Sequence, residues 1–308
     1  MRVLFAGTSS FAVTILQGLL ANKDVNLLGV ITQPDRPKGR KGVLTPSPVK
    51  EFALGAGLTI YQPEKIKSAD FILVLKDLAP DLMVVAAYGQ ILSEEILNLP
   101  KFGCINVHGS LLPKYRGAAP AQFAILNGEK VSGVTIMEMD KGMDTGAMLK
   151  KVVVPIGDNM TSGELLEELA KAGSSALDEV LGTLGSAAYQ PQKQNEDEAT
   201  YAHLIKREME AIDWQKSAQA IHNQIRAFNP EPGAYTILPN GKQLKIWQSV
   251  MAQGSGSPGE IIAMDKKGFT VAALQGAIRV LEVQPEGKKP MRAGDFLNSR
   301  SIKVGDIL

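Results

Sequence analysis

Short apolar runs alternate with segments of helical period in the first third of the chain, and this alternation constrains the fold most. Four runs are rich in strand-forming residues, namely Val3 to Ala6, Val25 to Thr32, Asp81 to Ala87 and Cys104 to Val107. After the first run, apolar residues recur at four-residue spacing over positions 11–19. Strands that alternate with helices are typical of α/β domains. We therefore predict a Rossmann-like domain with a largely parallel sheet.

Two more strands and a long helix are predicted beyond these runs. Residues 131–139 and 148–154 have strand character, and we expect them to form an antiparallel pair. Thr161 and Glu164 have the spacing of a capping box, in which each residue bonds the backbone N–H of the other. A helix should therefore begin directly after Thr161.

The last hundred residues follow a different pattern. A helix is predicted through Ala218 to Phe228, and Asn229-Pro230 ends it. Short segments of strand character follow, separated by glycine-containing turns, and such regular spacing favours a small, OB-like β-barrel. The predicted domain bounds are 1–189 for the first domain, 190–206 for a polar linker and 207–308 for the barrel.

The composition limits the possible partners and chemistry. The chain has 308 residues and a net charge of +1, so a nucleic-acid partner must be held by a local basic patch. Its single cysteine, Cys104, excludes an internal disulfide and fits a cytoplasmic protein, and its apolar surroundings predict a packing role. No apolar run is long enough to span a membrane. One cysteine and three histidines cannot form a zinc-type site, so we expect no metal.

Three polar side chains could surround one reacting carbonyl. Asn106 and His108 end a predicted strand on the same face, because side chains alternate with period two, and Asp144 lies further along. An amide donor and an imidazolium can stabilise an oxyanion, and a carboxylate beside them can relay a proton. The spacing alone also fits a buried structural histidine beside a loop aspartate, so both interpretations stay open at this point.

Longer motifs around these residues carry a family resemblance. The segment from Asn106 to Gly117 resembles the core motif of the 10-formyltetrahydrofolate-dependent formyltransferases, and Gly133 to Gly146 resembles their second signature. The resemblance implies that Asn106, His108 and Asp144 are catalytic and that an amine attacks the formyl carbon of the donor. It also implies a folate site made of Ser110, Leu111, Leu112, Pro113, Ala87, Tyr88, Gly89, Gln90, Ile91 and Leu92.

A basic loop follows the second predicted strand. Residues 33–50 lack helical or strand period and are rich in glycine and proline, and only one acid, Asp35, accompanies five basic residues, Arg36, Lys38, Arg40, Lys41 and Lys50. Such a loop suits a phosphate backbone, although an ordinary solvated charge run would have the same composition. The loop resembles the insertion of methionyl-tRNA formyltransferases, which implies that Arg40 contacts the acceptor, with Arg36, Lys38 and Lys41 in support.

The C-terminal region is also basic. Lys206 and Arg207 begin a tail with scattered lysines, and residues 226–234 resemble the C-terminal domain of the same enzymes. The resemblance implies initiator methionyl-tRNA as acceptor, with the barrel as its binding domain, and we expect a monomer. Three alternatives stay open: water as acceptor, an amino sugar nucleotide as acceptor, and an RNA-binding protein without enzymatic activity.

Overall fold

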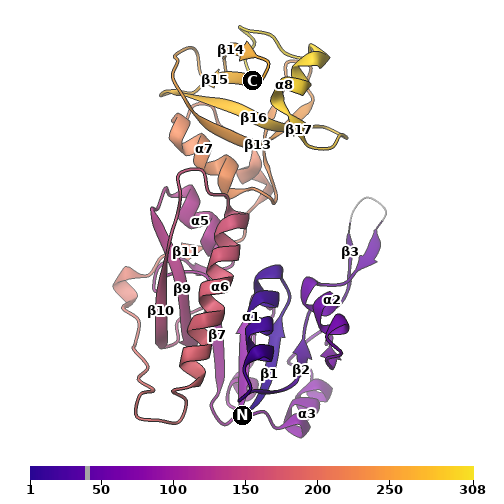
Figure 1. Ribbon diagram of the computed structural model, residues 1–308, viewed down its shortest axis with the longest axis vertical. Helices are drawn as coiled ribbons and strands as arrows, with labels where there is room; N and C mark the ends of the chain where they lie inside the picture. The colour runs from indigo at the N-terminus through magenta and orange to yellow at the C-terminus, as the bar shows by residue number, and fades with distance from the viewer. Residues whose placement is uncertain (39–41) are drawn as a thin grey trace. The chain divides into compact units, whose positions relative to one another are not determined.

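Two compact units make up the protein in the computed structural model, which describes residues 1–38 and 42–308 (Figure 1). The first unit comprises Met1–Gly117, Ser132–Val154 and Leu166–Tyr201. The second unit comprises Ala118–Val131, Pro155–Leu165 and Ala202–Leu308. Segments from the middle of the chain therefore pack with the C-terminal residues.

A seven-stranded sheet forms the centre of the first unit, in the order β10-β9-β7-β6-β1-β2-β5. Five of these strands run parallel to their neighbours, and β9 runs antiparallel to β7, so the predicted α/β class with a largely parallel sheet is confirmed. The strands are β1 (Arg2–Gly7), β2 (Asn26–Ile31), β5 (Ile60–Tyr61), β6 (Leu82–Ala86), β7 (Cys104–His108), β9 (Val131–Glu138) and β10 (Met148–Pro155).

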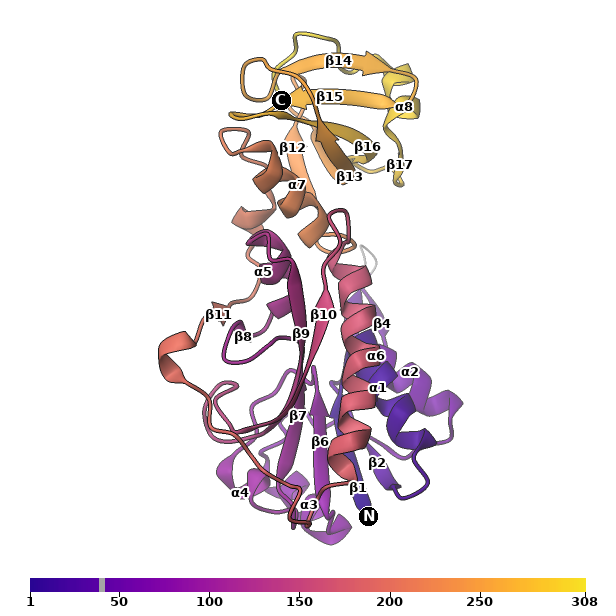
Figure 2. The same cartoon turned by 60° about the vertical axis from the view of Figure 1, so that its left-hand side comes forward.

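Helices cover both faces of this sheet. On one face, α1 (Ser10–Ala21) lies beside α6 (Ser162–Leu181), as Figure 2 shows. Asn22, directly after α1, donates a hydrogen bond to Asp178 of α6. On the other face, α3 (Ala69–Leu78) and α4 (Glu94–Leu97) pack on a cluster of buried side chains that includes Leu4, Met83 and Cys104. Alternate residues of each strand therefore enter two separate cores.

Local sequence signals set the starts of two helices. The backbone N–H of Thr161 donates to Glu164 Oε2 (2.8 Å), and Thr161 Oγ1 accepts from the Glu164 N–H (3.2 Å), so the predicted capping box is confirmed. Ser47 Oγ accepts from the Lys50 N–H and caps α2 (Pro48–Gly55).

The second unit is built on an antiparallel sheet in the order β12-β13-β16-β15-β14, with β17 paired to β16. This sheet is consistent with the predicted small barrel. Its strands are β12 (Ala234–Ile237), β13 (Gln243–Ala252), β14 (Ile261–Asp265), β15 (Gly268–Ala272), β16 (Ala277–Pro285) and β17 (Met291–Arg292). The helices of this unit are α5 (Pro120–Leu126), α7 (Ala218–Ala227), α8 (Ala293–Phe296), η2 (Arg207–Glu210) and η3 (Leu297–Ser299).

Small elements complete the described chain. A hairpin of β3 (Arg36–Lys38) and β4 (Val43–Thr45) occupies the predicted basic loop, and β8 (Arg116–Gly117) pairs with β11 (Tyr201–Ala202). A single 3-10 turn, η1 (Glu196–Glu198), lies in the predicted linker. Among the described helices, none has the length and apolar character needed to cross a membrane.

Candidate active site

The carboxyl end of β7 presents the two predicted strand residues of the site. Val107 points to the α1/α6 face, where a Cβ on Gly173 would lie only 2.8 Å from its Cγ1. Cys104 points to the opposite face, and Asn106 and His108 follow it at period two. They lie where ligands bind in open α/β sheets, at the carboxyl ends of the strands.

Asp144 lies beside both of these side chains. Asn106 Nδ2 donates to Asp144 Oδ1 at 3.4 Å, and His108 Nδ1 lies 3.6 Å from Asp144 Oδ2. The imidazole is largely buried and the carboxylate is 17% exposed, so the pair is shielded without being sealed from solvent. The structure thus brings together three residues that the sequence places up to 38 positions apart.

Backbone groups fix the orientation of this trio. Gly117 N–H donates to Asp144 Oδ2 at 2.8 Å, and Asp144 has a φ of 56°, an unusual conformation for a residue with a side chain. His108 Nε2 lies 3.0 Å from the carbonyl oxygen of Tyr115. A carbonyl can only accept, so Nε2 carries a proton and Nδ1 is the nitrogen that faces Asp144.

The arrangement can stabilise negative charge on an oxygen and move a proton. The Asn106 amide supplies a donor, the His108 ring supplies a second one at Nδ1 when it is protonated there, and Asp144 supplies a carboxylate to stabilise that imidazolium. Cys104 is buried under α4 and burial raises the pKa of its thiol to about 12, which keeps it protonated and unreactive. The predicted packing role of Cys104 agrees with this environment.

The residues predicted to surround the folate divide into accessible and buried groups. The Ala87–Leu92 loop follows β6, the parallel neighbour of β7, and therefore lies at the same sheet edge as the trio. Ile91 is 86% exposed, and Ala87, Gly89, Gln90 and Leu111 are also accessible. By contrast, the buried members support the accessible ones from within the protein; they are Tyr88, Leu92, Ser110, Leu112 and Pro113.

Two of these loop residues have structural bonds. Ser110 Oγ donates to the carbonyl of Lys114 at 2.6 Å, which closes the turn after β7. Gln90 uses its side-chain amide to bond the backbone of Ile66, Pro63 and Glu64. Both side chains are therefore bonded to the protein itself and hold these loops in place.

The predicted tRNA contacts are distributed over both units. In the first unit, Arg36 lies on β3 with its guanidinium 3.7 Å from Glu64, and both side chains are largely exposed. Lys38 is the last residue of β3, while Arg40 and Lys41 lie outside the described residues. In the second unit, Lys206 and Arg207 are both exposed, at the start of η2.

Lys50 does not contribute a free charge to the basic loop. Its ammonium lies 2.7 Å from Asp35 Oδ2, and both side chains are partly buried. Hydrogen bonds from Lys50, and then from Gln62, hold the pKa of the Asp35 carboxyl below its usual value. The sequence suggested five basic residues facing one acid, but one of the five neutralises that acid at the base of the hairpin.

Sequence reasoning missed two residues that bind the trio's surroundings. Arg116 is fully buried and its guanidinium bonds Gln194 and Glu196, which belong to the segment predicted as a linker. Gln194 in turn donates to the carbonyl oxygens of Asp144 and Gly146. The polar composition of 190–200 gave no signal of this burial, because the partners of Gln194 are two backbone carbonyls and the guanidinium of Arg116, all far away in the sequence.

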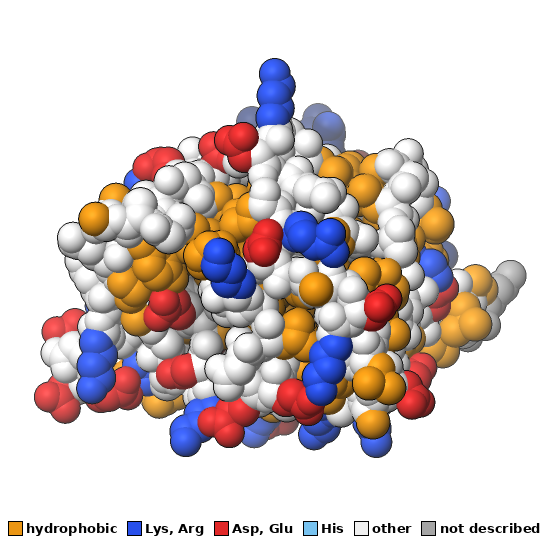
Figure 3. Space-filling view, turned by 90° about the horizontal axis from the view of Figure 1, so that it is seen from below, with side chains coloured by type: hydrophobic (Ala, Val, Ile, Leu, Met, Phe, Trp, Pro, Cys, Tyr) orange, Lys and Arg blue, Asp and Glu red, His pale blue; other side chains and the backbone are white. Residues whose placement is uncertain are grey.

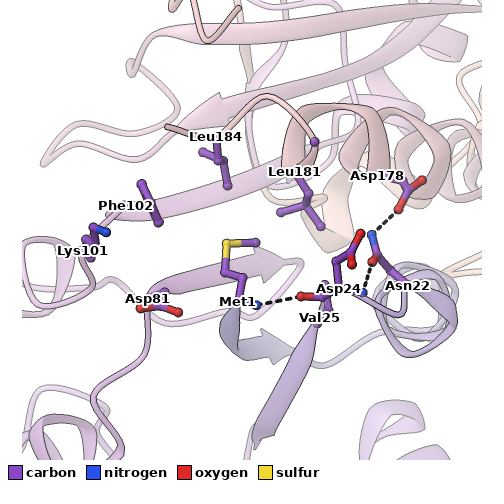
Figure 4. Close-up of a pocket in the computed structure, with 11 residues that line it drawn as sticks. Met1, Asn22, Asp24, Val25, Asp81, Lys101, Phe102, Asp178, Leu181 and Leu184 are labelled. Atoms are coloured by element: carbon purple, nitrogen blue, oxygen red, sulfur yellow. Dashed lines mark hydrogen bonds between the residues drawn. The ribbon is translucent and has the colours of Figure 1, made fainter. Parts of the chain in front are cut away.

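A separate cavity of about 510 Å³ opens at the opposite edge of the sheet (Figure 4). Met1, Val25, Asp81 and Phe102 line it, and each precedes a strand or begins the chain before one. Ligands of open α/β sheets bind at the other edge, so this cavity is not where the fold predicts a ligand.

The surface seen from below carries charges of both signs. Acidic and basic side chains are interspersed there, with no broad area of one sign among the residues drawn in colour (Figure 3).

Within residues 1–38 and 42–308, no group of three or more His, Cys, Asp or Glu side chains is placed to hold a metal ion. The donor set of the trio has one imidazole and one carboxylate, which is fewer than the three protein ligands of a catalytic zinc site. The groups that this site offers for chemistry are its hydrogen-bond donors and its carboxylate.

Comparison with known proteins shows the family. Residues 1–181 match the family model for formyl transferase, and residues 204–301 match the model for the formyl transferase C-terminal domain. The chain belongs to the formyl transferase family. The match covers the seven-stranded sheet, the trio at its edge and the antiparallel sheet of the second unit.

Relatives and solved structures extend this assignment. The chain is 46% identical to methionyl-tRNA formyltransferase of Bacillus subtilis over 310 residues, covering all of this chain and 97% of that protein. The sugar 3N-formyl transferase WlaRD, solved with dTDP and 5-N-formyl-THF, is 26% identical with a TM-score of 0.66, covering 94% of this chain and 99% of that one. HypX from Aquifex aeolicus, solved with tetrahydrofolic acid, shares the fold at 16% identity and a TM-score of 0.68, covering 99% of this chain and 48% of that one.

Proposed function

We propose that the protein transfers a formyl group from 10-formyltetrahydrofolate to the free amino group of methionyl initiator tRNA, in support of translation initiation. The observation that carries the proposal is the Asn106–His108–Asp144 constellation within a chain that is similar along its whole length to methionyl-tRNA formyltransferases. When an amine attacks the carbonyl carbon of a formyl donor, an oxyanion forms and the amine releases a proton. This constellation would stabilise the oxyanion and accept the proton.

The folate supplies an activated formyl group, and we infer that it lies along the accessible part of the Ala87–Leu92 loop. The exposed Ile91 side chain offers apolar surface for an aromatic ring system at the edge that also carries His108. Tyr88 and Leu92 anchor the loop in the core beneath. The residues present therefore fit such a ligand.

The side chains of the trio would divide the work of transfer. The amine attacks the formyl carbon, and negative charge develops on the formyl oxygen. Asn106 Nδ2 would donate to this oxygen, and so would Nδ1 of a protonated His108, since Nε2 bonds the Tyr115 carbonyl. Asp144 would stabilise the imidazolium and accept the proton released by the amine, directly or through one water. The adduct then collapses: the bond between the formyl carbon and the folate nitrogen breaks, and the proton taken from the amine is returned to that nitrogen.

The basic residues outside this edge would hold the tRNA. Arg36 and Lys38 lie on β3, which pairs with β4, where Val43 and Leu44 are exposed. We infer that these two cations, together with Arg40 and Lys41 beyond them in the sequence, contact the acceptor stem. Lys206 and Arg207 would contact the phosphate backbone from the second unit. We also propose domain bounds of 1–189 and 207–308, joined by residues 190–206. The separate family matches over residues 1–181 and 204–301 support this division.

Formyl transfer with purified components tests the function. The protein is incubated with 10-formyltetrahydrofolate and charged initiator tRNA, and formylmethionyl-tRNA is quantified by mass spectrometry after deacylation. We expect formylated methionine and no turnover without tRNA. Formate release at the same rate in the absence of tRNA would instead identify a hydrolase, and formylation of an amino sugar nucleotide would identify a sugar formyltransferase.

The substrates proposed here place the protein in the cytoplasm, where aminoacylated tRNA is used. We propose that it acts as a monomer, because the trio and the loops around it all come from one chain. Light scattering at assay concentrations tests this, and a dimer mass of the active species would contradict it.

A further inference from the structure

We propose that residues 194–200, here named the brace, position the catalytic trio through Gln194 and Thr200. This inference rests on the proposed function, since it concerns the geometry of the same site. The brace is polar and was predicted to be part of a linker, yet it bonds both the backbone of Asp144 and the loop that follows His108. Its members would act through these loops and would not touch the substrate.

Gln194 is the buried centre of the brace. Its side chain is 4% exposed, and Nε2 donates to the carbonyl oxygen of Asp144 at 2.7 Å and to that of Gly146 at 2.8 Å. Its Oε1 accepts from Nε (3.1 Å) and Nη2 (2.8 Å) of Arg116. Both donors and the acceptor of this amide are therefore satisfied. Because Asp144 has a φ of 56°, an external bond to its carbonyl helps to hold that conformation.

Arg116 fixes Gln194 in turn. The guanidinium is fully buried, and Nη1 and Nη2 each lie 2.8 Å from a different carboxylate oxygen of Glu196. This bidentate pair restricts the guanidinium in both distance and plane. Arg116 also precedes Gly117, whose N–H bonds Asp144 Oδ2. The carboxylate and the carbonyl of Asp144 are thus both held by one network.

Thr200 braces the histidine side of the site. Its Oγ1 accepts from the Tyr115 N–H at 2.8 Å, its carbonyl accepts from the Arg116 N–H at 2.8 Å, and its N–H donates to the Pro113 carbonyl at 3.3 Å. The carbonyl of Tyr115 is the group that bonds His108 Nε2. The brace therefore contacts the immediate partner of His108 as well as the backbone of Asp144.

The chemistry of these bonds distinguishes positioning from simple packing. Burying an apolar side chain carries no penalty for unmade hydrogen bonds, whereas burying an amide costs free energy unless all its donors and acceptors are bonded. Here the partners are the loops beside the two ionisable residues of the trio. A displacement of about 1 Å at such groups can cost roughly 100-fold in rate. The network is built where such a displacement matters most.

Gln194→Glu is the decisive variant because it keeps an acceptor for Arg116 and loses the donor to Asp144 and Gly146. The matched control is Gln192→Ala, since Gln192 lies two residues before the brace, is exposed, and pairs with Met148 through its backbone. Wild type and both variants are compared in kcat, in KM for folate and tRNA, in Tm, and in the ring-nitrogen NMR shifts of His108.

For Gln194→Glu we expect kcat to fall about 10- to 100-fold, with both KM values within about twofold and Tm changed by only a few degrees. The ring-nitrogen shifts of His108 should move, whereas those of His222 should not. Gln192→Ala should match wild type in all readouts. A Gln194→Glu variant with normal kcat and unmoved His108 signals would overturn the inference.

The remaining outcomes also decide the question. If Gln194→Glu fails to fold, Gln194→Met is measured in the same way, and failure of both variants to fold would assign Gln194 to stability alone and overturn the inference. If wild type itself transfers no formyl group, the proposed function fails, but the NMR comparison still tests whether Gln194 positions His108. The two failures are therefore distinguishable.

Discussion

His108 Nδ1 lies 3.6 Å from Asp144 Oδ2, and the same carboxylate oxygen accepts the Gly117 N–H at 2.8 Å. The second bond leaves the carboxylate little freedom to turn away from the imidazole. A fixed carboxylate stabilises the charge that an imidazole acquires with a proton, without reorganising during the reaction. The pairing therefore makes Asp144 the residue whose removal should affect chemistry more than binding.

Asp144→Asn should lower kcat by about 100- to 10,000-fold, because the amide keeps the shape of the side chain but has no charge to stabilise an imidazolium. The KM for methionyl-tRNA and the affinity for folate should change little. Single-turnover kinetics and equilibrium tRNA binding, measured on the same preparation, separate these quantities.

Asp140→Asn is the matched control for this substitution. Asp140 belongs to the same loop, but within the described part of the chain its Oδ1 accepts from Gly142 N–H and Thr145 Oγ1 and from no member of the trio. The asparagine retains an oxygen acceptor for both donors, so we expect near-normal kcat. Equal losses in the two variants would mean that loop structure, and not the charge of Asp144, sets the rate.

The sequence predicted the elements of this site better than their contacts. Period-two alternation correctly put Asn106 and His108 on one face of β7, because hydrogen bonding to β6 and β9 fixes the pleat. The capping box of Thr161 and Glu164 was also predicted, since both partners are local. Signals that depend on a few neighbouring residues therefore carried over to the structure.

Long-range polar contacts could not be predicted in this way. Gln194 bonds carbonyl oxygens 50 and 48 residues away, and a backbone carbonyl has no sequence signature. The burial of Leu112 was equally hidden, because an apolar residue in a loop can face a ligand or the core. Only the folded chain separates the accessible Ile91 from such supporting residues.

Arg40→Ala should raise the KM for initiator tRNA while folate binding stays unchanged, because a lost phosphate contact removes affinity without altering the donor site. The slope of log affinity against log salt should become less steep by about one unit if Arg40 contacts a single phosphate. Lys23→Ala serves as control, since Lys23 is an exposed cation of the first unit on the turn before β2. Unchanged salt dependence in Arg40→Ala would remove Arg40 from the tRNA contacts.

Cys104 should be inert in the folded protein. Burial raises the pKa of its thiol from 9.0 to about 12, so at pH 8 only about one thiol in ten thousand would be ionised. Iodoacetamide should label the protein in denaturant and leave the native protein unlabelled, as judged by mass spectrometry. Rapid labelling without denaturant would contradict the buried environment.

The same shift predicts a pH dependence of stability. The folded-state pKa is raised, so the contribution of Cys104 is fully present below pH 9, where the thiol is protonated in both states. It is lost as pH rises from about 9 to 12, because the unfolded chain ionises first. Cys104→Ala should lose stability less steeply than wild type over this range in urea titrations.

Gly146→Ala should destabilise the fold and the loop that carries Asp144. A Cβ at position 146 would lie only 1.9 Å from the carbonyl oxygen of Glu138, and a backbone atom cannot move aside as a flexible side chain can. We expect a loss of about 1–3 kcal/mol in the free energy of unfolding, as for other overpacked sites. Gly55→Ala is the control, because a Cβ there meets no atom within 4 Å, and it should stabilise α2 by about 0.4–1 kcal/mol. Urea unfolding of both variants measures the difference, and equal stabilities would show that the β9 backbone can retreat from position 146.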